Sequence, residues 1–331
     1  MYQESPDQRR GQLIMSVPGA PLANATYRPN SRIPCVEFQL DLLPSVYAIE
    51  LCVALAGNLF AIWLLLSRER KNWHTGVVLS CNLAVSDLLY VLTLPLLIDY
   101  YRLDKHWNFG NVMCKIERFM FACNLYVSIF FIMGISVNRC VALAYPFFTR
   151  SQVTPSRVKV ASAIIWLVVA SFSSPVLKFA STCPAGGSNN TECVAHCSSD
   201  HGDRRSHFYY VVWLGVLGCF VPFLVTFASY CVVIWVVWKN TNISRLDKQK
   251  IALMVISVVV LYALSFVPYH VFQSYNLYLK IFYPGVIYCW VYDAYQVSKV
   301  LAALNMCLHP LLYMAVFDSI RVVFCGKNQD E

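Results

Sequence analysis

The chain has 331 residues, of which 58% are hydrophobic and 13% are charged, and its formal net charge is +8. Soluble domains average roughly 45–50% apolar and about 25% charged residues, so this composition excludes an ordinary water-soluble domain and predicts a membrane protein. The net positive charge does not call for nucleic acid as a partner, because Lys and Arg also gather in the cytosolic loops of membrane proteins.

Seven apolar segments follow a polar stretch, residues 1–42, and lie at about 43–66, 76–99, 112–143, 158–179, 209–237, 251–276 and 291–317. Each is near the ~20 residues that a membrane-spanning helix needs. We therefore expect an all-α membrane protein in three parts: the segment 1–42, a bundle of seven transmembrane helices over 43–317, and a cytosolic tail, 318–331, that starts with a short amphipathic helix. No apolar core with a small-residue cleavage site opens the chain, so we expect no cleaved signal peptide.

The loops after the first, third and fifth segments are the basic ones, around residues 68–71, 150–159 and 239–250. The other loops mix charges of both signs. Because Lys and Arg concentrate in cytosolic loops, we expect a multi-pass plasma-membrane protein with an extracellular amino terminus. Asn24 and Asn189 then begin extracellular glycosylation sequons, and Cys325, in the cytosolic tail, is a candidate for palmitoylation.

Six cysteines map to the outer, oxidising side of such a bundle, namely Cys35, Cys114, Cys183, Cys193, Cys197 and Cys289. Disulfides form and persist in that environment. We favour two pairings. One joins Cys114 to a cysteine of the loop between the fourth and fifth segments, with Cys197 as the candidate, and the other joins Cys35 to Cys289.

The last apolar segment carries Lys299, Asn305 and His309 inside its apolar run. A polar group at membrane depth costs several kcal/mol unless it faces a partner or water, so each is a candidate functional residue. His309 also opens the sequence His-Pro-Leu-Leu-Tyr, which ends at Tyr313. This sequence resembles the (Asn/Asp)-Pro-x-x-Tyr signature of rhodopsin-like G-protein-coupled receptors, with His as a departure.

Other motifs of that family follow in the matching order on the other segments: Gly57-Asn58, Asn82 to Asp87, His106 to Gly110, Asn138-Arg139-Cys140 in place of Asp-Arg-Tyr, Trp166, Pro222, and Phe266 to Tyr269. Together they cover nearly the whole chain. The resemblance implies a receptor that signals through a heterotrimeric G protein, with arrestin and receptor kinases as further partners.

A narrower resemblance, to the metabotropic purinergic receptors, is carried by Glu117-Arg118-Phe119, Asn124-Leu125-Tyr126, Val267 to His270 and Tyr295-Gln296-Val297. Tyr145 to Phe148, Lys299 and the His309 motif are similar to the ATP-preferring branch of that family. The resemblance implies an extracellular, ATP-like nucleotide as the ligand. It also implies calcium as the second messenger, with cyclic AMP as a second route.

A nucleoside triphosphate carries several negative charges, so its receptor needs cationic side chains that converge in a cavity of low dielectric constant. Arg118 lies one helical turn past Cys114, and Lys299 lies in the outer part of the last segment. We expect both to bind phosphate. The other expected ligand residues are Phe121, Tyr126, Tyr269, His270, Gln273, Tyr295, Gln296, Arg204 and Arg205.

Each of these residues also has a purely structural interpretation. Arg118 could pair with an acid of a neighbouring helix or point outward, and Lys299 could pair with Asp293 or with an acid of an outer loop. His270 could be a packed, hydrogen-bonded histidine. Arg204 and Arg205 could belong to a solvated loop. Gln273 stands where similar purinergic receptors carry Lys or Arg, and the loss of a charged hydrogen bond weakens binding by ~1.5–3 kcal/mol. Either the ligand is a less charged anion, or an arginine of the outer loop substitutes.

Two further groups are implied by the resemblance. The family's sodium-binding cluster is matched by Asp87, Asn124, Ser128 and Asn305, with His309 beside it. A structural sodium ion is the one cofactor considered, and a water-filled polar network is the alternative. The G-protein-coupling group comprises Asn138, Arg139, Tyr230 and Tyr313. Asn138 replaces the Asp that restrains this Arg, so we expect raised basal signalling.

Four alternatives compete with the nucleotide receptor. A receptor for a small dicarboxylate or an acidic lipid would also use basic residues on these helices. A retinal-binding photoreceptor would place its lysine where this chain has Ala303. A transporter or channel would show repeats or matching broken helices, and we find neither. An enzyme is disfavoured because the sequence has no phosphate loop, nucleophile elbow or metal-ligand spacing.

Overall fold

The structure is a computed structural model that describes residues 34–68, 74–185, 190–197, 200–283 and 288–325. The side chains of 34–38, 68 and 311–325 are not among those described. The first half of the chain forms α1 (Pro34–Arg68), α2 (Thr75–Val91), α3 (Leu94–Arg102), α4 (Gly110–Ala144), α5 (Pro146–Gln152), α6 (Pro155–Ser173) and α7 (Val176–Phe179). The second half forms β1 (Ser181–Pro184), β2 (Thr191–Val194), α8 (His201–Trp213), a π-helical segment (Leu214–Phe220), α9 (Val221–Lys239), α10 (Arg245–Phe282) and α11 (Cys289–Cys325).

Six helical stretches within the described residues are long and apolar enough to cross a membrane: Gln39–Ser67, Thr75–Arg102, Gly110–Ala144, Pro155–Phe179, His201–Lys239 and Arg245–Phe282. They correspond to the first six predicted segments. The seventh is α11, which packs against α1 and α10. Residues 318–325, expected as a short amphipathic helix, are helical and continue α11.

Prolines explain where the longer stretches are interrupted. A turn at residues 92–93 separates α2 from α3 just before Pro95, and another at 174–175, which includes Pro175, separates α6 from α7. Proline removes a backbone donor and disrupts the preceding helical turn. The π-helical segment ends at Phe220, two residues before Pro222, and Pro222 has the same effect there.

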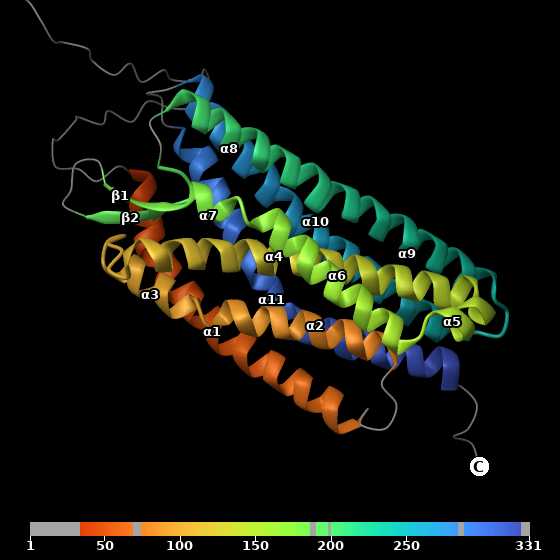
Figure 1. The fold of residues 1–331 in the computed structure, drawn as a ribbon. Coiled ribbons are helices and arrows are strands. Elements are labelled where there is room, and N and C mark those ends of the chain that lie inside the picture. Colours follow the sequence, from red (N-terminus) through yellow and green to blue (C-terminus); the bar gives the residue numbers. More distant parts are fainter. Residues whose placement is uncertain (1–33, 69–73, 186–189, 198–199, 284–287, 326–331) are drawn as a thin grey trace, which may run out of the picture.

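The bundle is organised around α4, which contacts α2, α6 and α9. In the most apolar part of α4, 72% of the residues are buried, whereas the corresponding part of α6 has 17% buried. The apolar side chains that α6 leaves uncovered are those expected to face lipid. Figure 1 shows β1 and β2 at one end of the bundle, beside the loop that joins α3 to α4. We call this the hairpin end.

Two disulfides, each with both cysteines among the described residues, stabilise the hairpin end. Cys114, in the first turns of α4, is bonded to Cys193 of β2, and Cys183 of β1 is bonded to Cys197. The prediction of Cys197 as the partner of Cys114 is therefore wrong. The antiparallel register that pairs Thr182 with Cys193 leaves Cys193 next to α4, while Cys197 lies beyond the end of β2.

Candidate functional site

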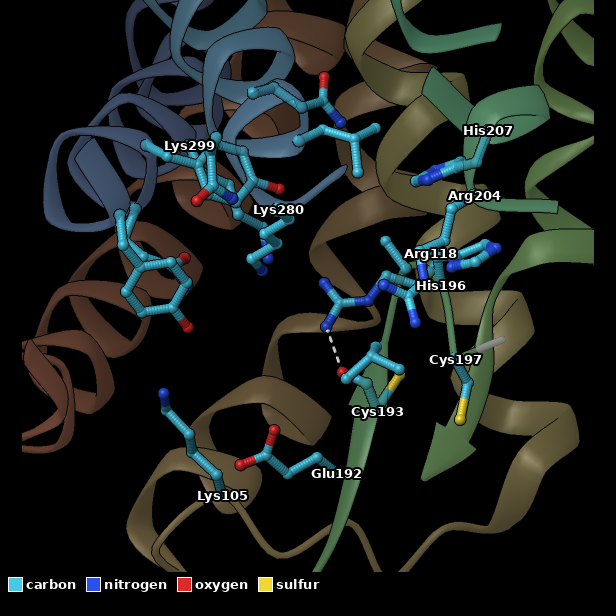
Figure 2. A pocket seen from close by; sticks show the side chains of 18 of the residues that line it. Lys105, Arg118, Glu192, Cys193, His196, Cys197, Arg204, His207, Lys280 and Lys299 are labelled. Atoms are coloured by element: carbon cyan, nitrogen blue, oxygen red, sulfur yellow. Dashed lines mark hydrogen bonds between the residues drawn. The ribbon is translucent and has the colours of Figure 1, made fainter. Parts of the chain in front are cut away.

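The hairpin end holds a cavity of about 520 Å³. Five cationic side chains line it, and they come from five different parts of the chain: Lys105, Arg118, Arg204, Lys280 and Lys299. Glu192 is the one acidic residue among the described residues that line it. Figure 2 shows these cationic side chains surrounding one open space. Such an excess of positive charge in a half-enclosed site favours a polyanionic ligand.

Arg118 is fixed in the wall of the cavity by two partners. Its Nη2 donates a hydrogen bond of 2.9 Å to the carbonyl oxygen of Cys193, and its Nε lies 3.3 Å from the Oε2 of Glu117. The first contact exists because the disulfide holds β2 against α4. The second is the ion pair considered from the sequence, but the acid is on α4 itself rather than on a neighbouring helix. Both partners orient the guanidinium and leave further donors for a ligand.

Lys299 lies deeper, and only 5% of it is exposed. Its Nζ lies 5.3 Å from the centroid of the Phe121 ring, a cation–π contact. Glu117 and Glu50, both fully buried, are the acids that interact with it electrostatically. In the described part of the chain, no ion pair joins Lys299 to Asp293, so that structural interpretation is not supported.

A smaller cavity, of about 60 Å³, adjoins the first one. Its lining is mostly apolar and includes Phe121, Tyr126, Tyr269 and Tyr295 from the expected ligand set. Arg118, Gln273 and Lys299 line both cavities. These three residues therefore mark the junction between a cationic chamber and an aromatic floor.

The four remaining expected ligand residues differ in position. Gln296 and Arg204 line the large cavity, whereas Arg205 is exposed and lines neither cavity. His270 is 1% exposed and also lines neither. Its Nδ1 lies 2.8 Å from the carbonyl oxygen of Phe266, so Nδ1 carries the proton and Nε2 accepts from the Tyr126 hydroxyl at 3.1 Å. His270 is thus the packed, hydrogen-bonded histidine of the alternative interpretation.

The sequence interpretation missed Lys105, Lys280, His196 and His207, all of which line the large cavity. Lys280 lies two helical turns after Gln273 on the same helix, and that spacing could have revealed it. Lys105 and His196 lie in loops, where no periodicity places a side chain.

Both oxygens of the Asp87 carboxylate have side-chain partners. Its Oδ1 accepts a hydrogen bond of 3.0 Å from Asn124, and its Oδ2 lies 2.8 Å from Nδ1 of His309. Asn305 makes only a long contact, 3.5 Å, with the carbonyl oxygen of Ala302 on its own helix. Asp87 is thus hydrogen-bonded to both Asn124 and His309, and the sodium site stays a prediction.

At the opposite end of the bundle, Arg139 is 8% exposed and contacts α10 through Met254, whose sulfur lies 3.4 Å from its Nη1. Tyr230 of α9 interacts with it electrostatically. Arg139 of α4 therefore contacts α10 through Met254. The neighbouring residue, Asn138, has no carboxylate that could restrain Arg139. The side chain of Tyr313 lies outside the described residues.

Four predictions, of modified residues or of a disulfide pairing, concern residues or side chains that the structure does not describe. Asn24 and Asn189 belong to segments that the structure does not describe, and neither the Cys35 nor the Cys325 side chain is described. Cys289 is disulfide-bonded. The Cys35–Cys289 pairing stays a prediction.

Comparison with known proteins assigns the chain to a family. Residues 57–313 match the family model "7 transmembrane receptor (rhodopsin family)". The chain belongs to the rhodopsin family of receptors. The receptor is thus a multi-pass membrane protein of the G-protein-coupled class, and its family is one of receptors rather than enzymes.

Among curated proteins, the receptor is 35% identical over 329 residues to P2Y purinoceptor 11 of Homo sapiens, which covers 93% of this chain and 88% of that protein. It is 32% identical over 321 residues to P2Y purinoceptor 1 of Bos taurus, covering 93% and 85%. P2Y purinoceptor 1 of Rattus norvegicus is 34% identical over 289 residues, or 86% of this chain and 76% of that protein. The resemblance to purinergic receptors is confirmed.

Proposed function

We propose that the receptor binds an extracellular, ATP-like nucleotide in the cavity at the hairpin end. It then signals through a heterotrimeric G protein to calcium, with cyclic AMP as a second route. The observation that carries this proposal is the convergence of five cationic side chains, with one acid among the described lining residues, on a single cavity. The names of the similar proteins, P2Y purinoceptors, agree with it.

The charge and the size of the cavity suit a triphosphate. Its volume of about 520 Å³ falls within the range of about 300–1,000 Å³ that is usual for small-molecule sites. A dicarboxylate would need only one or two of the five cations, and it would leave the others as like charges in a site of low dielectric constant. The polyphosphate chain of a nucleotide neutralises more of them.

The absence of a cation at Gln273 therefore does not argue for a smaller anion. Gln273 lines both cavities, and Arg204 and Lys280 line the large one beside it. The expectation that a loop arginine substitutes is supported by the position of Arg204. Arg204 comes from the start of α8, directly after the loop that contains β1 and β2.

The cavity opens at the hairpin end, and this end must be extracellular if the ligand is. Two disulfides lie there, and disulfides persist in oxidising environments. The described basic loops, around 150–159 and 239–250, lie at the other end, in agreement with the positive-inside rule (Figure 1). We accordingly assign 1–42 to the outside and the tail 318–331 to the cytosol of a plasma-membrane receptor.

Signalling then follows from a population shift. Arg118 on α4, Gln273 on α10 and Lys299 on α11 all border the cavity, so a polyanion between them draws the three helices together. Pro268 lies inside α10, a residue type that weakens a helix locally. Movement about this point displaces the other end of α10 from Arg139. The ligand shifts the equilibrium only by its differential affinity for the two states.

The test is calcium release in cells that express the receptor, challenged with ATP, ADP, UTP and small dicarboxylates. We expect ATP to act, and we expect Arg118→Ala, Lys299→Ala and Arg204→Ala each to lower its potency by about tenfold or more. Arg205→Ala is the matched control, because it removes the neighbouring arginine that lines neither cavity. A response to dicarboxylates alone would refute the nucleotide assignment.

A further inference from the structure

Lys105 has an unusual environment for a charged side chain in a loop. It lies between α3 and α4, it lines the large cavity, and only 6% of it is exposed. Burial of an ammonium group is unfavourable unless an anion compensates it. The described part of the chain provides no ion pair to Lys105. The acids near it are Asp293, which interacts with it electrostatically, and Glu192, which lines the same cavity and lies beside Lys105 in Figure 2.

The backbone holds Lys105 in this position against its own preference. Asp104 and Lys105 have φ angles of 52° and 62°, a left-handed conformation that Cβ-bearing residues rarely adopt. Such a conformation persists only where its surroundings impose it, and it is found preferentially at functional sites.

The neighbouring hairpin imposes it here. Asn190 donates a hydrogen bond of 3.1 Å to the carbonyl oxygen of Asp104, the Thr191 amide donates to Nδ1 of His106 at 3.1 Å, and the Trp107 amide donates to the carbonyl oxygen of Thr191 at 2.7 Å. The loop is therefore fastened to β2, and the Lys105 side chain is directed into the cavity.

A second lysine lies on the same aromatic ring. The Nζ of Lys105 lies 5.7 Å from the centroid of Tyr292, and the Nζ of Lys280 lies 5.6 Å from it. The distance between the two ammonium groups is thus less than twice the distance from the Lys105 Nζ to the ring centroid. No acid among the described residues forms an ion pair with either lysine. Figure 2 shows Lys105 and Lys280 on opposite sides of the cavity, with both side chains directed into it. An anion placed in the cavity between these two like charges compensates both.

This pair is distinct from the deeper pair of cations. Arg118 and Lys299 line both cavities, whereas Lys105, Lys280 and Tyr292 line only the large one. If the base of a nucleotide lies towards the aromatic floor, Arg118 and Lys299 are the cations nearest to the base. Lys105 and Lys280 are then the cations farthest from it. A phosphate chain that reaches the second pair must be longer than one that reaches only the first.

We propose that Lys105 and Lys280 bind the terminal phosphate of a nucleoside triphosphate, and that they make the receptor select triphosphates over diphosphates. This inference rests on the proposed function and adds to it the residues that read the length of the phosphate chain. Arg118 and Lys299 contact the inner phosphates, which triphosphates and diphosphates share.

The test compares ATP with ADP on the full-length receptor in cells, by calcium release and with surface expression measured in parallel. Where ADP does not activate, it is measured as a competitor of ATP. In Lys105→Gln and in Lys280→Gln, we expect ATP potency to fall about tenfold to a hundredfold, as for loss of a charged hydrogen bond. We expect ADP potency to stay within about twofold, because ADP lacks the phosphate that these residues bind.

Two further variants make the result specific. Lys105→Arg keeps the charge and should retain most of the ATP potency. Lys178→Gln is the control, since this lysine is also at the hairpin end but its side chain is 73% exposed and lines neither cavity. Equal losses for ATP and ADP, or no loss for ATP, would overturn the inference and leave the proposed function intact. A wild-type receptor that neither binds nor responds to ATP and ADP would overturn both.

Discussion

The hydrogen bond between His309 and Asp87 offers a direct test of how the centre of the bundle is stabilised. Its two atoms are 2.8 Å apart, and the side chains are 1% and 0% exposed. His309→Ala leaves the Asp87 carboxylate buried, with Asn124 as the remaining partner in the described structure. Removing one partner of a buried hydrogen bond costs about 1–3 kcal/mol, and more where the remaining group is a carboxylate, because that group is left unsatisfied. We expect a loss of stability of that order.

The assay is thermal unfolding of the purified receptor in detergent, with four proteins compared: wild type, His309→Ala, Asp87→Asn, and the double variant. The double variant should be more stable than the sum of the single losses predicts, because it no longer contains an uncompensated carboxylate. Asn305→Ala is the control, since this buried neighbour on α11 makes only a hydrogen bond of 3.5 Å. The reasoning is refuted if His309→Ala unfolds at the same temperature as Asn305→Ala, or if the single losses simply add.

Three other substitutions test separate parts of the structure. Gln273→Arg adds a cation to the wall of the cavity, so ATP potency should rise about tenfold in the calcium assay; unchanged potency would contradict the assigned position. Gly218→Ala places a methyl group 2.6 Å from the Tyr126 ring, so it should lower stability by about 1–3 kcal/mol in thermal unfolding. The control Gly134→Ala, whose nearest contact is 3.8 Å away, should cost less. Asn138→Asp should lower basal G-protein signalling without ligand, and an unaltered baseline would remove that hypothesis.

The membrane bundle could be predicted from the sequence, because apolar length and the positions of basic loops are local properties of the chain. Six of the seven predicted segments match apolar helical stretches, and the seventh lies in α11. The depth of Arg118 and Lys299 was also predictable, since a fixed rise per residue places each of them along its own helix. The family motifs then indicated a nucleotide receptor.

Which of these groups are in contact depends on the packing of the helices and could not be predicted from the sequence. His309 and Asp87 are 222 residues apart, and their hydrogen bond depends on how α11 packs near α2. Arg204 faces the cavity while the adjacent Arg205 does not, because consecutive residues of a helix point in directions about 100° apart and the rotation of α8 is set by its packing.

The same holds for the loops at the hairpin end. The strand register selected Cys193 rather than Cys197 as the partner of Cys114. The hydrogen bonds from β2 to residues 104–107 directed Lys105 into the cavity. A loop has no period that fixes the direction of its side chains, so the residues that complete the cationic cavity depend on contacts between segments far apart in the sequence.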